Sequence, residues 1–184
     1  DSSTSRGLGD VYKRQAQLRN PRHLTALRVA GERRGVEFLE QAPVTDFVVH
    51  GDEWRAAVVG GREYSADRFC VTAGAWTGKL LERAGVSVGV LPIRGQMALW
   101  KATPGLLRHI INEGPRYIVP RLDGHILAGS TEEEAGFDKR TTDEGVRGLV
   151  EFAHQYVPAL RSLPLARSWA GLRPGVYDGL PFLG

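Results

Sequence analysis

Two segments far apart in the sequence carry side chains suited to binding a small organic acid. Residues 117–121 read Tyr-Ile-Val-Pro-Arg, and residues 169–175 read Trp-Ala-Gly-Leu-Arg-Pro-Gly. A guanidinium donates two parallel hydrogen bonds to a carboxylate and stays charged at any working pH. We therefore predict that Arg173, together with the phenol of Tyr117, binds the carboxylate of a small amino acid. The alternative is that Arg173 is a solvated arginine in a Gly/Pro turn.

The composition indicates a globular chain. With 184 residues and 42% hydrophobic content, the chain can build one good core or two small ones. No apolar run approaches the roughly 18 to 20 residues that a membrane helix needs, and no signal-peptide pattern is present. The single cysteine, Cys70, lies in an apolar run, so we expect a buried, inert thiol and no disulfide within the chain. These features predict a cytoplasmic protein that does not bind a membrane.

The charge distribution argues against nucleic-acid binding. The pI is about 9.2, but the net charge is only +3, and the arginines are interleaved with acidic residues throughout. A mildly basic pocket for a small anion fits this scatter better. No convincing catalytic triad or metal motif emerges, and His109 and His125 are interpreted as structural or solvent-facing.

The amino-terminal part of the chain alternates between helix and strand signals. Residues 1–15 have no periodicity and are interpreted as a non-native leader. Asn20 and Pro21 begin a helix that extends to about residue 34, where Gly35 stops it. Short strands are predicted next, at residues 36–40, 44–50, 54–59 and 63–64, the last three forming a small meander.

Residues 68–73 are continuously apolar apart from Arg68, which predicts a strand buried on both faces of a parallel sheet. A small-residue turn, Thr72-Ala73-Gly74, then leads into a helix that ends before Gly85. Such a turn places backbone N–H groups at a helix start, where anionic cofactor groups are often received. An ordinary tight turn remains the alternative.

From residue 86 onward the pattern changes to longer strands and one amphipathic helix. The predicted strands cover residues 88–93, 96–100, 116–120, 125–129 and 165–171. The helix begins near Thr142, carries apolar residues at helical spacing and stops at Pro158. The three glutamates at 132–134 are expected to form a solvated loop bordering the pocket.

Taken in order, six short motifs give the chain a resemblance to the flavin-dependent D-amino-acid oxidase superfamily. Within it the sequence is most similar to the glycine oxidases associated with thiamine biosynthesis. The motifs are Ala-Pro-Val at 42–44, Val-Thr-Ala-Gly-Ala-Trp at 71–76, Leu-Pro-Ile-Arg-Gly-Gln at 91–96, Tyr-Ile-Val-Pro-Arg at 117–121, Leu-Ala-Gly-Ser-Thr at 127–131, and 169–175 followed by Asp-Gly-Leu-Pro.

The resemblance implies a mixed α/β fold in which part of a doubly wound FAD-binding domain is interleaved with an antiparallel-sheet substrate domain. Residues 16–85 and 169–184 would belong to the first domain, and residues 86–168 to the second. It also implies that the Val44 backbone lies against the adenine side of FAD, that Thr72, Ala73 and Gly74 lie against the cofactor, and that Tyr117 and Arg173 line the substrate site.

The implied reaction is oxidative deamination of glycine or another small amine. The flavin accepts a hydride, dioxygen reoxidises it to give hydrogen peroxide, and the imino acid hydrolyses to an oxo acid and ammonia, so no catalytic acid or base is obligatory. A sarcosine oxidase or a quinone-linked D-amino-acid dehydrogenase of the same superfamily is the first alternative. A non-catalytic binding module is the second. The oligomeric state leaves no signature, and a homo-oligomer is compatible with the sequence.

The sequence also departs from the family pattern. The Gly-x-Gly-x-x-Gly loop that holds the FAD pyrophosphate in such proteins is missing, and so is a carboxy-terminal glycine-rich stretch. We therefore expect the 184-residue chain to be an internal fragment that binds FAD weakly or not at all and is inactive, while the full-length protein is the enzyme.

Overall fold

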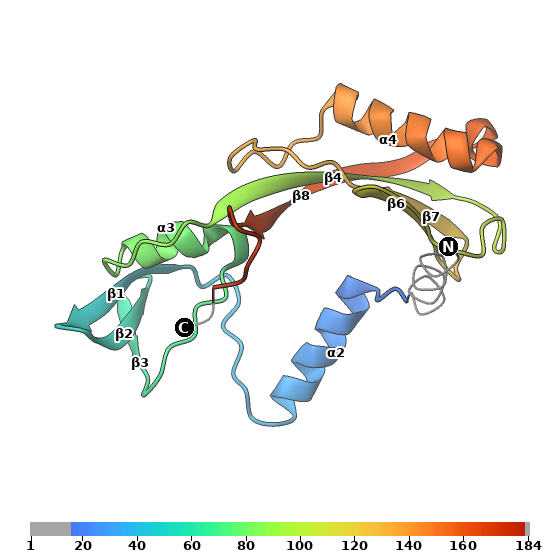
Figure 1. The fold of residues 1–184 in the computed structure, drawn as a ribbon. Helices are drawn as coiled ribbons and strands as arrows, with labels where there is room; N and C mark the ends of the chain where they lie inside the picture. The colour runs from blue at the N-terminus through green and yellow to red at the C-terminus, as the bar shows by residue number, and fades with distance from the viewer. Residues whose placement is uncertain (1–15, 183–184) are drawn as a thin grey trace, which may run out of the picture. The chain divides into compact units, whose positions relative to one another are not determined.

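The computed structural model describes residues 16–182 and divides the chain into two units, Asp1–Gln41 and Ala42–Gly184. The described part of the first unit contains helix α2 (Asn20–Glu32), with proline in its first turn as predicted (Figure 1). Its chain reverses at Gly35, whose φ of +81° suits glycine. The predicted leader, residues 1–15, lies outside the described residues.

The prediction of a strand over residues 36–40 is wrong, because this segment packs back on α2 instead. The Val36 N–H donates to the Gly31 carbonyl at 3.0 Å. The Phe38 ring lies against Gly31 and under the guanidinium of Arg28, 5.6 Å from the ring centroid. A strand needs a neighbouring strand to satisfy its backbone, and the described part of this unit contains none.

The second unit begins with the predicted meander. Strands β1 (Val44–His50), β2 (Glu53–Val59) and β3 (Arg62–Ser65) form an antiparallel sheet in that order. The turns fall where the glycines predicted them, at Gly51 (φ +62°) and at Gly60 and Gly61 (φ +56° and +80°). Local turn chemistry therefore determines this sheet.

The prediction of a doubly buried strand over residues 68–73 is wrong for the described part of the chain. The segment has no strand partner and leads into the short helices η1 (Gly74–Trp76) and α3 (Thr77–Glu82). Cys70, predicted to be buried, is exposed. All strand pairs among the described residues are antiparallel, so no parallel sheet surrounds this apolar segment.

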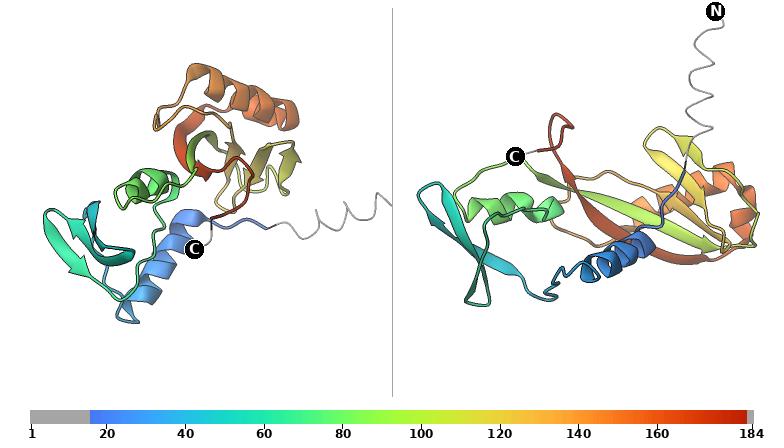
Figure 2. Two further views of the ribbon diagram at one scale, coloured as in Figure 1. Left: turned by 60° about the vertical axis from the view of Figure 1, so that its left-hand side comes forward. Right: turned by 90° about the horizontal axis from the view of Figure 1, so that it is seen from below.

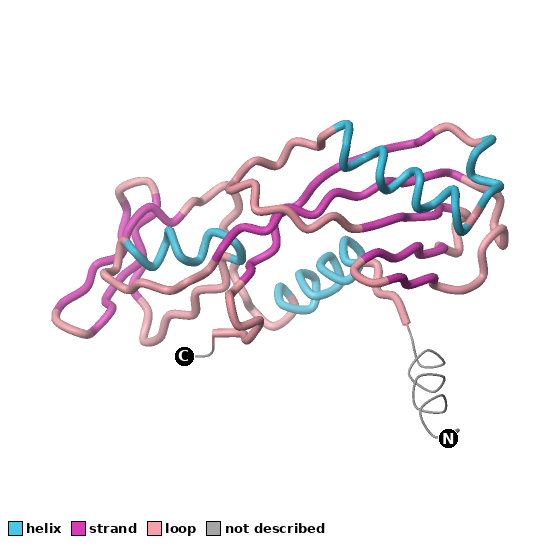
Figure 3. The backbone as a smooth tube through the Cα atoms, turned by 45° about the horizontal axis from the view of Figure 1, so that its top comes forward, coloured by secondary structure: helices cyan, strands magenta, loops and turns pink. Residues whose placement is uncertain are grey.

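A five-stranded antiparallel sheet forms the rest of the second unit (Figure 3). Its order is β5 (Ile111–Glu113), β6 (Arg116–Pro120), β7 (His125–Gly129), β4 (Leu91–Lys101) and β8 (Leu165–Gly175). The two strands predicted at 88–93 and 96–100 are a single strand, β4, because it pairs with β8 along its whole length.

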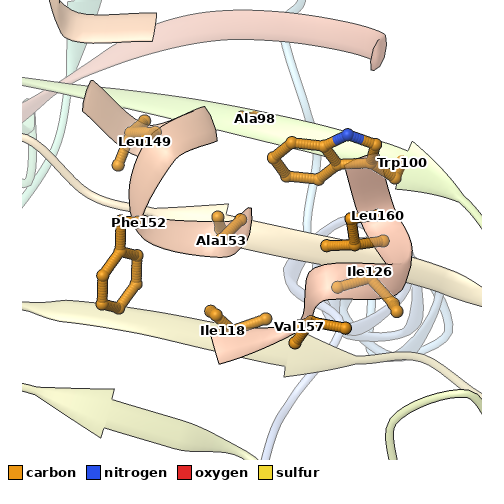
Figure 4. Close-up of a cluster of buried hydrophobic side chains, with 10 residues drawn as sticks. Ala98, Trp100, Ile118, Ile126, Leu149, Phe152, Ala153, Val157 and Leu160 are labelled. Carbon is orange, nitrogen blue, oxygen red and sulfur yellow. The ribbon is translucent and has the colours of Figure 1, made fainter. Parts of the chain in front are cut away.

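Helix α4 (Asp143–Tyr156) covers one face of this sheet and supplies the main core (Figure 1, Figure 2). Thr142 caps it, accepting from the Gly145 N–H at 3.1 Å, and the 3-10 helix η2 (Pro158–Ser162) follows it. The buried cluster, drawn in Figure 4, comprises Ala98, Trp100, Ile118, Ile126, Ala128, Leu149, Phe152, Ala153, Val157 and Leu160. The mixed helix and antiparallel-sheet architecture predicted from the sequence is confirmed.

Candidate active site

The two residues predicted to bind substrate lie on the same face of the five-stranded sheet. Tyr117 pairs with Gly129, Gly129 with Met97, and Met97 with Trp169, so all four lie in one row across β6, β7, β4 and β8. Residues opposite each other in an antiparallel ladder share a face, and faces alternate along a strand. Arg173 is four residues beyond Trp169 on β8 and therefore shares this face.

This face is the one turned away from helix α4. The neighbours of Met97 on β4 have the opposite parity, and two residues of that parity, Ala98 and Trp100, are buried in the core beneath α4. On β4, the residues on the same face as Ala98 and Trp100 therefore form the core, and those on the same face as Met97 line the candidate site.

Arg173 lies within β8, opposite Ile93, and not in a turn as its Gly/Pro surroundings predicted. Its side chain bends over Gly95, where an added Cβ would lie 3.2 Å from Arg173 Nη2. Nη2 donates to the carbonyl of Thr131 at 2.9 Å, and Nη1 is 3.2 Å from Glu132 Oε1. The Arg173 side chain is 46% exposed, so its fork can still be reached by a solute.

Tyr117 reaches over Gly129 toward Met97. Its hydroxyl donates to Met97 Sδ at 3.7 Å, and a thioether is a weak acceptor. An added Cβ at Gly129 would overlap the Met97 thioether and lie 3.2 Å from Tyr117 Cζ. The phenol is therefore held by one weak hydrogen bond above Gly129 and can exchange its sulfur partner for a better acceptor.

Two glycines, Gly95 and Gly171, lie between the row that contains Tyr117 and the position of Arg173 on this face. Gly95 pairs with Gly171 two residues along from the row that holds Tyr117, which is about 7 Å at the rise of a strand. Because Arg173 bends back over Gly95, its guanidinium approaches that row.

The loop that contacts Arg173 is held from the helix side by a polar network. Arg94 and Gln96 are buried and have the core-facing parity of β4. Arg94 pairs with Glu133 through its Nε at 2.9 Å and through Nη2, and Gln96 Nε2 donates to Glu133 Oε1 at 2.7 Å and to Thr142 Oγ1 at 2.9 Å. The network ties the loop after β7 to the start of α4.

The expectation that residues 132–134 form a solvated loop is wrong for Glu133 and holds for exposed Glu134. Burial raises the pKa of the Glu133 carboxyl, but hydrogen bonds from Thr131, Gln96 and Arg94 outweigh burial and hold the pKa below its ordinary value of 4.5. Its backbone also exchanges hydrogen bonds with that of Arg94, at 2.8 and 3.0 Å. Glu133 is therefore an ionised anchor of the loop.

Thr72, Ala73 and Gly74, predicted to lie against a cofactor, lead into η1. Gly74 has a φ of +58°, and an added Cβ there would meet nothing within 4 Å, so its backbone is uncovered. Helix η1 contacts both β4 and β8, the strands that carry Met97 and Arg173. The contact of these three residues with a cofactor stays a prediction.

The loop from β7 to α4 also touches η1. The rings of Trp76 and Phe137 are 5.8 Å apart, and Lys79 Nζ lies 3.8 Å from the centroid of Phe137. The loop that holds Arg173 thus contacts Trp76 of η1 and Lys79 of α3, which follow the segment predicted to contact cofactor. Val44, also predicted to contact cofactor, begins β1, an edge strand whose outer backbone groups have no partner within its three-stranded sheet.

An open groove of about 1620 Å³ runs along the apolar segment that precedes η1. Its lining includes Phe69, Cys70, Val71, Val86 and Val88, together with the start of β2. Thr72 borders this groove, whereas Tyr117 and Arg173 do not. The groove is therefore separate from the candidate substrate face.

Sequence reasoning missed Met97, Thr131 and the partnership of Glu132 with Arg173. Part of the signal was present, because Gly95 and Met97 alternate with the buried Arg94, Gln96 and Ala98. The pairing of Glu132 with Arg173 joins residues 41 positions apart, so periodicity alone does not reveal it. Among residues 16–182, no group of three His, Cys, Asp or Glu side chains is placed to hold a metal ion, and no helix is long and apolar enough to cross a membrane.

The fold is that of FAD-dependent oxidoreductases. The chain belongs to the DAO family of FAD dependent oxidoreductases, whose pattern matches residues 5–184. This confirms the superfamily and the cofactor, FAD, that the sequence motifs implied.

Particular relatives sharpen the comparison. The chain is 37% identical over 185 residues to the glycine oxidase of Pseudomonas aeruginosa, covering 97% of this chain and 51% of the relative. It is 38% identical over 172 residues to the hydrogen cyanide synthase subunit HcnC of Pseudomonas protegens, covering 90% of this chain and 40% of that one. The crystal structure of glycine oxidase from Geobacillus kaustophilus superposes with a TM-score of 0.80 at 30% identity, covering 87% of this chain and 43% of that chain. The chain thus spans about half the length of these relatives or less.

Proposed function

We propose that the full-length protein carrying this chain is an FAD-dependent oxidase of glycine or another small amino acid. The observation that carries the proposal is the placement of Tyr117 and Arg173 on one face of the sheet, across a floor of glycines and away from α4. The similarity to proteins named glycine oxidase supports the choice of substrate class. We further propose a cytoplasmic location.

In this proposal Arg173 binds the substrate carboxylate through its planar fork. It is fixed at Nη2 by the Thr131 carbonyl and remains half exposed, so it can accept an anion without rearrangement of the strand. The Tyr117 hydroxyl replaces its weak bond to Met97 with a bond to a substrate oxygen. Gly95 and Gly171 carry no side chain on this face, which agrees with a small amino acid as the substrate.

FAD, when bound, supplies the two-electron oxidation of the substrate carbon–nitrogen bond. The overall reaction balances as amino acid, dioxygen and water giving oxo acid, ammonia and hydrogen peroxide. The chain's own residues orient the substrate, and the Thr72–Gly74 backbone borders the cofactor. Orientation of this kind lowers the barrier without a protein acid or base.

The electron acceptor separates this proposal from its closest alternative, a dehydrogenase of the same superfamily. The similarity to a hydrogen cyanide synthase subunit shows that relatives with other names share this fold at comparable identity. Peroxide release by the full-length protein with glycine, sarcosine and D-alanine distinguishes the two. Substrate-dependent reduction of a quinone or dye without peroxide would instead support the dehydrogenase.

The test of the site is Arg173→Ala in the full-length protein. Each charge-assisted hydrogen bond is worth about 1.5 to 3 kcal/mol, so loss of even one raises KM roughly 10- to 150-fold. Arg147→Ala, an exposed arginine on α4, is the matched control and should leave KM unchanged. Equal KM values for the two variants would refute the role of Arg173.

For the 184-residue chain alone, we propose weak FAD binding and no turnover, because the chain spans about half the length of its relatives. Flavin absorbance of the purified chain measures this directly. Stoichiometric bound FAD would overturn the proposal.

A further inference from the structure

We infer that Glu132 is a built-in competitor for the substrate carboxylate on Arg173, and that it selects against substrates bearing a second acidic group. The inference rests on the proposed function, because it assumes that Arg173 is the carboxylate-binding residue. It adds a residue that sets both the affinity and the charge preference of the site.

The geometry places a carboxylate where a substrate carboxylate is expected. Glu132 Oε1 is 3.2 Å from Arg173 Nη1, while Nη2 of the same guanidinium is held by the Thr131 carbonyl. The Thr131 carbonyl is neutral and serves as a fixed support. Glu132 is the charged partner, and a ligand carboxylate that binds across both Nη groups shares Nη1 with it or displaces it.

The pair is exposed enough to open. The side chains of Arg173 and Glu132 are 46% and 58% exposed, and exposed ion pairs contribute only about 0.2 to 1 kcal/mol. Glu132 therefore lowers the affinity for a carboxylate modestly and does not block the site. When Glu132 moves aside it stays tethered to the neighbouring loop, so its negative charge remains close to the bound ligand.

The rest of the loop fixes Glu132 in this position. Its neighbour Glu133 is bridged to the Arg94 backbone and points its carboxylate to the buried network on the helix side. The ion pair with Arg173 directs the Glu132 side chain to the substrate face, while the Glu133 carboxylate contacts Arg94 and Gln96. Glu134 is exposed and carries the same charge on the same loop, which makes it a natural control.

A charge preference follows from this arrangement. A monocarboxylate contacts Arg173 through its only anionic group. A dicarboxylate brings a second negative charge into the neighbourhood of Glu132, and like charges a few ångströms apart repel. Neutral small amino acids are thereby favoured over acidic ones.

The experiment compares Glu132→Gln with Glu134→Gln in the full-length protein, measuring the binding of acetate and malonate by calorimetry without turnover. We expect Glu132→Gln to lower the Kd of acetate about two- to fivefold, the range given by an exposed ion pair. The Kd of malonate should fall by a larger factor. Glu134→Gln should change neither ligand's Kd by as much as twofold.

The outcomes separate the two proposals. If Glu132→Gln binds acetate no more tightly than Glu134→Gln, or if malonate gains no more than acetate, the inference is wrong. Arg173→Ala tests the underlying function: unchanged acetate binding in that variant overturns both proposals. Lost acetate binding in Arg173→Ala with no gain in Glu132→Gln overturns only the role of Glu132. Thermal unfolding of each variant establishes that it is folded. This is expected for Glu132→Gln and Glu134→Gln, which are conservative changes at exposed side chains.

Discussion

The five-stranded sheet and the segment before η1, residues 65–72, differ in how far they bury their apolar side chains. Against α4, side chains such as Trp100, Ile118 and Leu160 are almost fully buried. Along residues 65–72, apolar side chains line an open groove, and Cys70 is exposed. The side chains beneath α4 thus form a complete core within this chain. Residues 65–72 include an apolar run typical of a core strand, but they have no neighbouring strand among the described residues.

The largest effect that tests this comparison is expected from Leu160→Ala. Leu160 lies on η2 and is fully buried in the core, so its truncation to alanine should lower the free energy of unfolding by about 2 to 5 kcal/mol. Val86→Ala, in the groove, should cost less than about 0.5 kcal/mol because Val86 is 40% exposed. Urea unfolding followed by tryptophan fluorescence measures both. Similar losses would show that the groove is packed as firmly as the core.

The next largest effect is expected from Glu133→Gln, which removes the anionic anchor of the loop. The loss should be about 1 to 3 kcal/mol at neutral pH, since buried Arg94 loses the nearer of its charged partners and keeps Asp138, whose Oδ2 is 3.6 Å from Arg94 Nη1. Because the pKa of Glu133 is lowered on folding, its stabilisation is present above the ordinary value of 4.5 and is lost as pH falls through the folded value. Unfolding free energies between pH 7 and pH 3 should therefore converge for variant and wild type. Glu134→Gln, the control, should run parallel to wild type, and a constant gap for Glu133→Gln would contradict the assignment.

A smaller effect is expected from Gly129→Ala within the substrate face. The added methyl overlaps Met97 Sδ and crowds Tyr117, and such overpacking costs about 1 to 3 kcal/mol unless these side chains move. Gly171→Ala is the matched control, because an added Cβ there meets nothing within 4 Å. Circular-dichroism melting curves compare the two variants. Equal melting temperatures would show that the Met97–Tyr117 contact is loose.

The smallest perturbation is labelling of Cys70. Since this thiol is exposed, maleimide should modify it in the folded 184-residue chain within about fivefold of the rate in denaturant, a margin chosen for an exposed side chain. Mass spectrometry follows the reaction, with Cys70→Ser as the blank. Protection by orders of magnitude would mean that the groove is closed in solution.

The parts of the fold that the sequence predicted well are those determined by neighbouring residues. The β1–β3 meander follows from Gly51 and Gly60 at its turns, and α4 follows from the cap at Thr142 and a helical apolar period. Residues 68–73 show the limit of this reasoning, because apolar composition predicts burial only when other strands are present to provide it.

The sequence predicted which residues form the candidate site, Tyr117 and Arg173, but not how the strands bring them together. The shared face of Tyr117 and Arg173 depends on the register of β6, β7, β4 and β8, which no single segment encodes. The Gly/Pro surroundings of Arg173 predicted a turn, yet pairing with β4 keeps it in a strand. Likewise, three successive glutamates look alike in sequence, and only the contacts of Glu133 with Arg94 and of Glu132 with Arg173 distinguish them.

Thr131 hydrogen-bonds both to the backbone of β4 and to Arg173. Its hydroxyl accepts the backbone N–H of Gln96 at 2.9 Å, and its carbonyl accepts from Arg173 at 2.9 Å. Thr131 therefore connects the strand that carries Ala98 and Trp100 to the guanidinium that we propose binds the ligand. We therefore expect some substitutions in the core beneath α4 to change ligand affinity, and some substitutions that change ligand affinity to change stability as well.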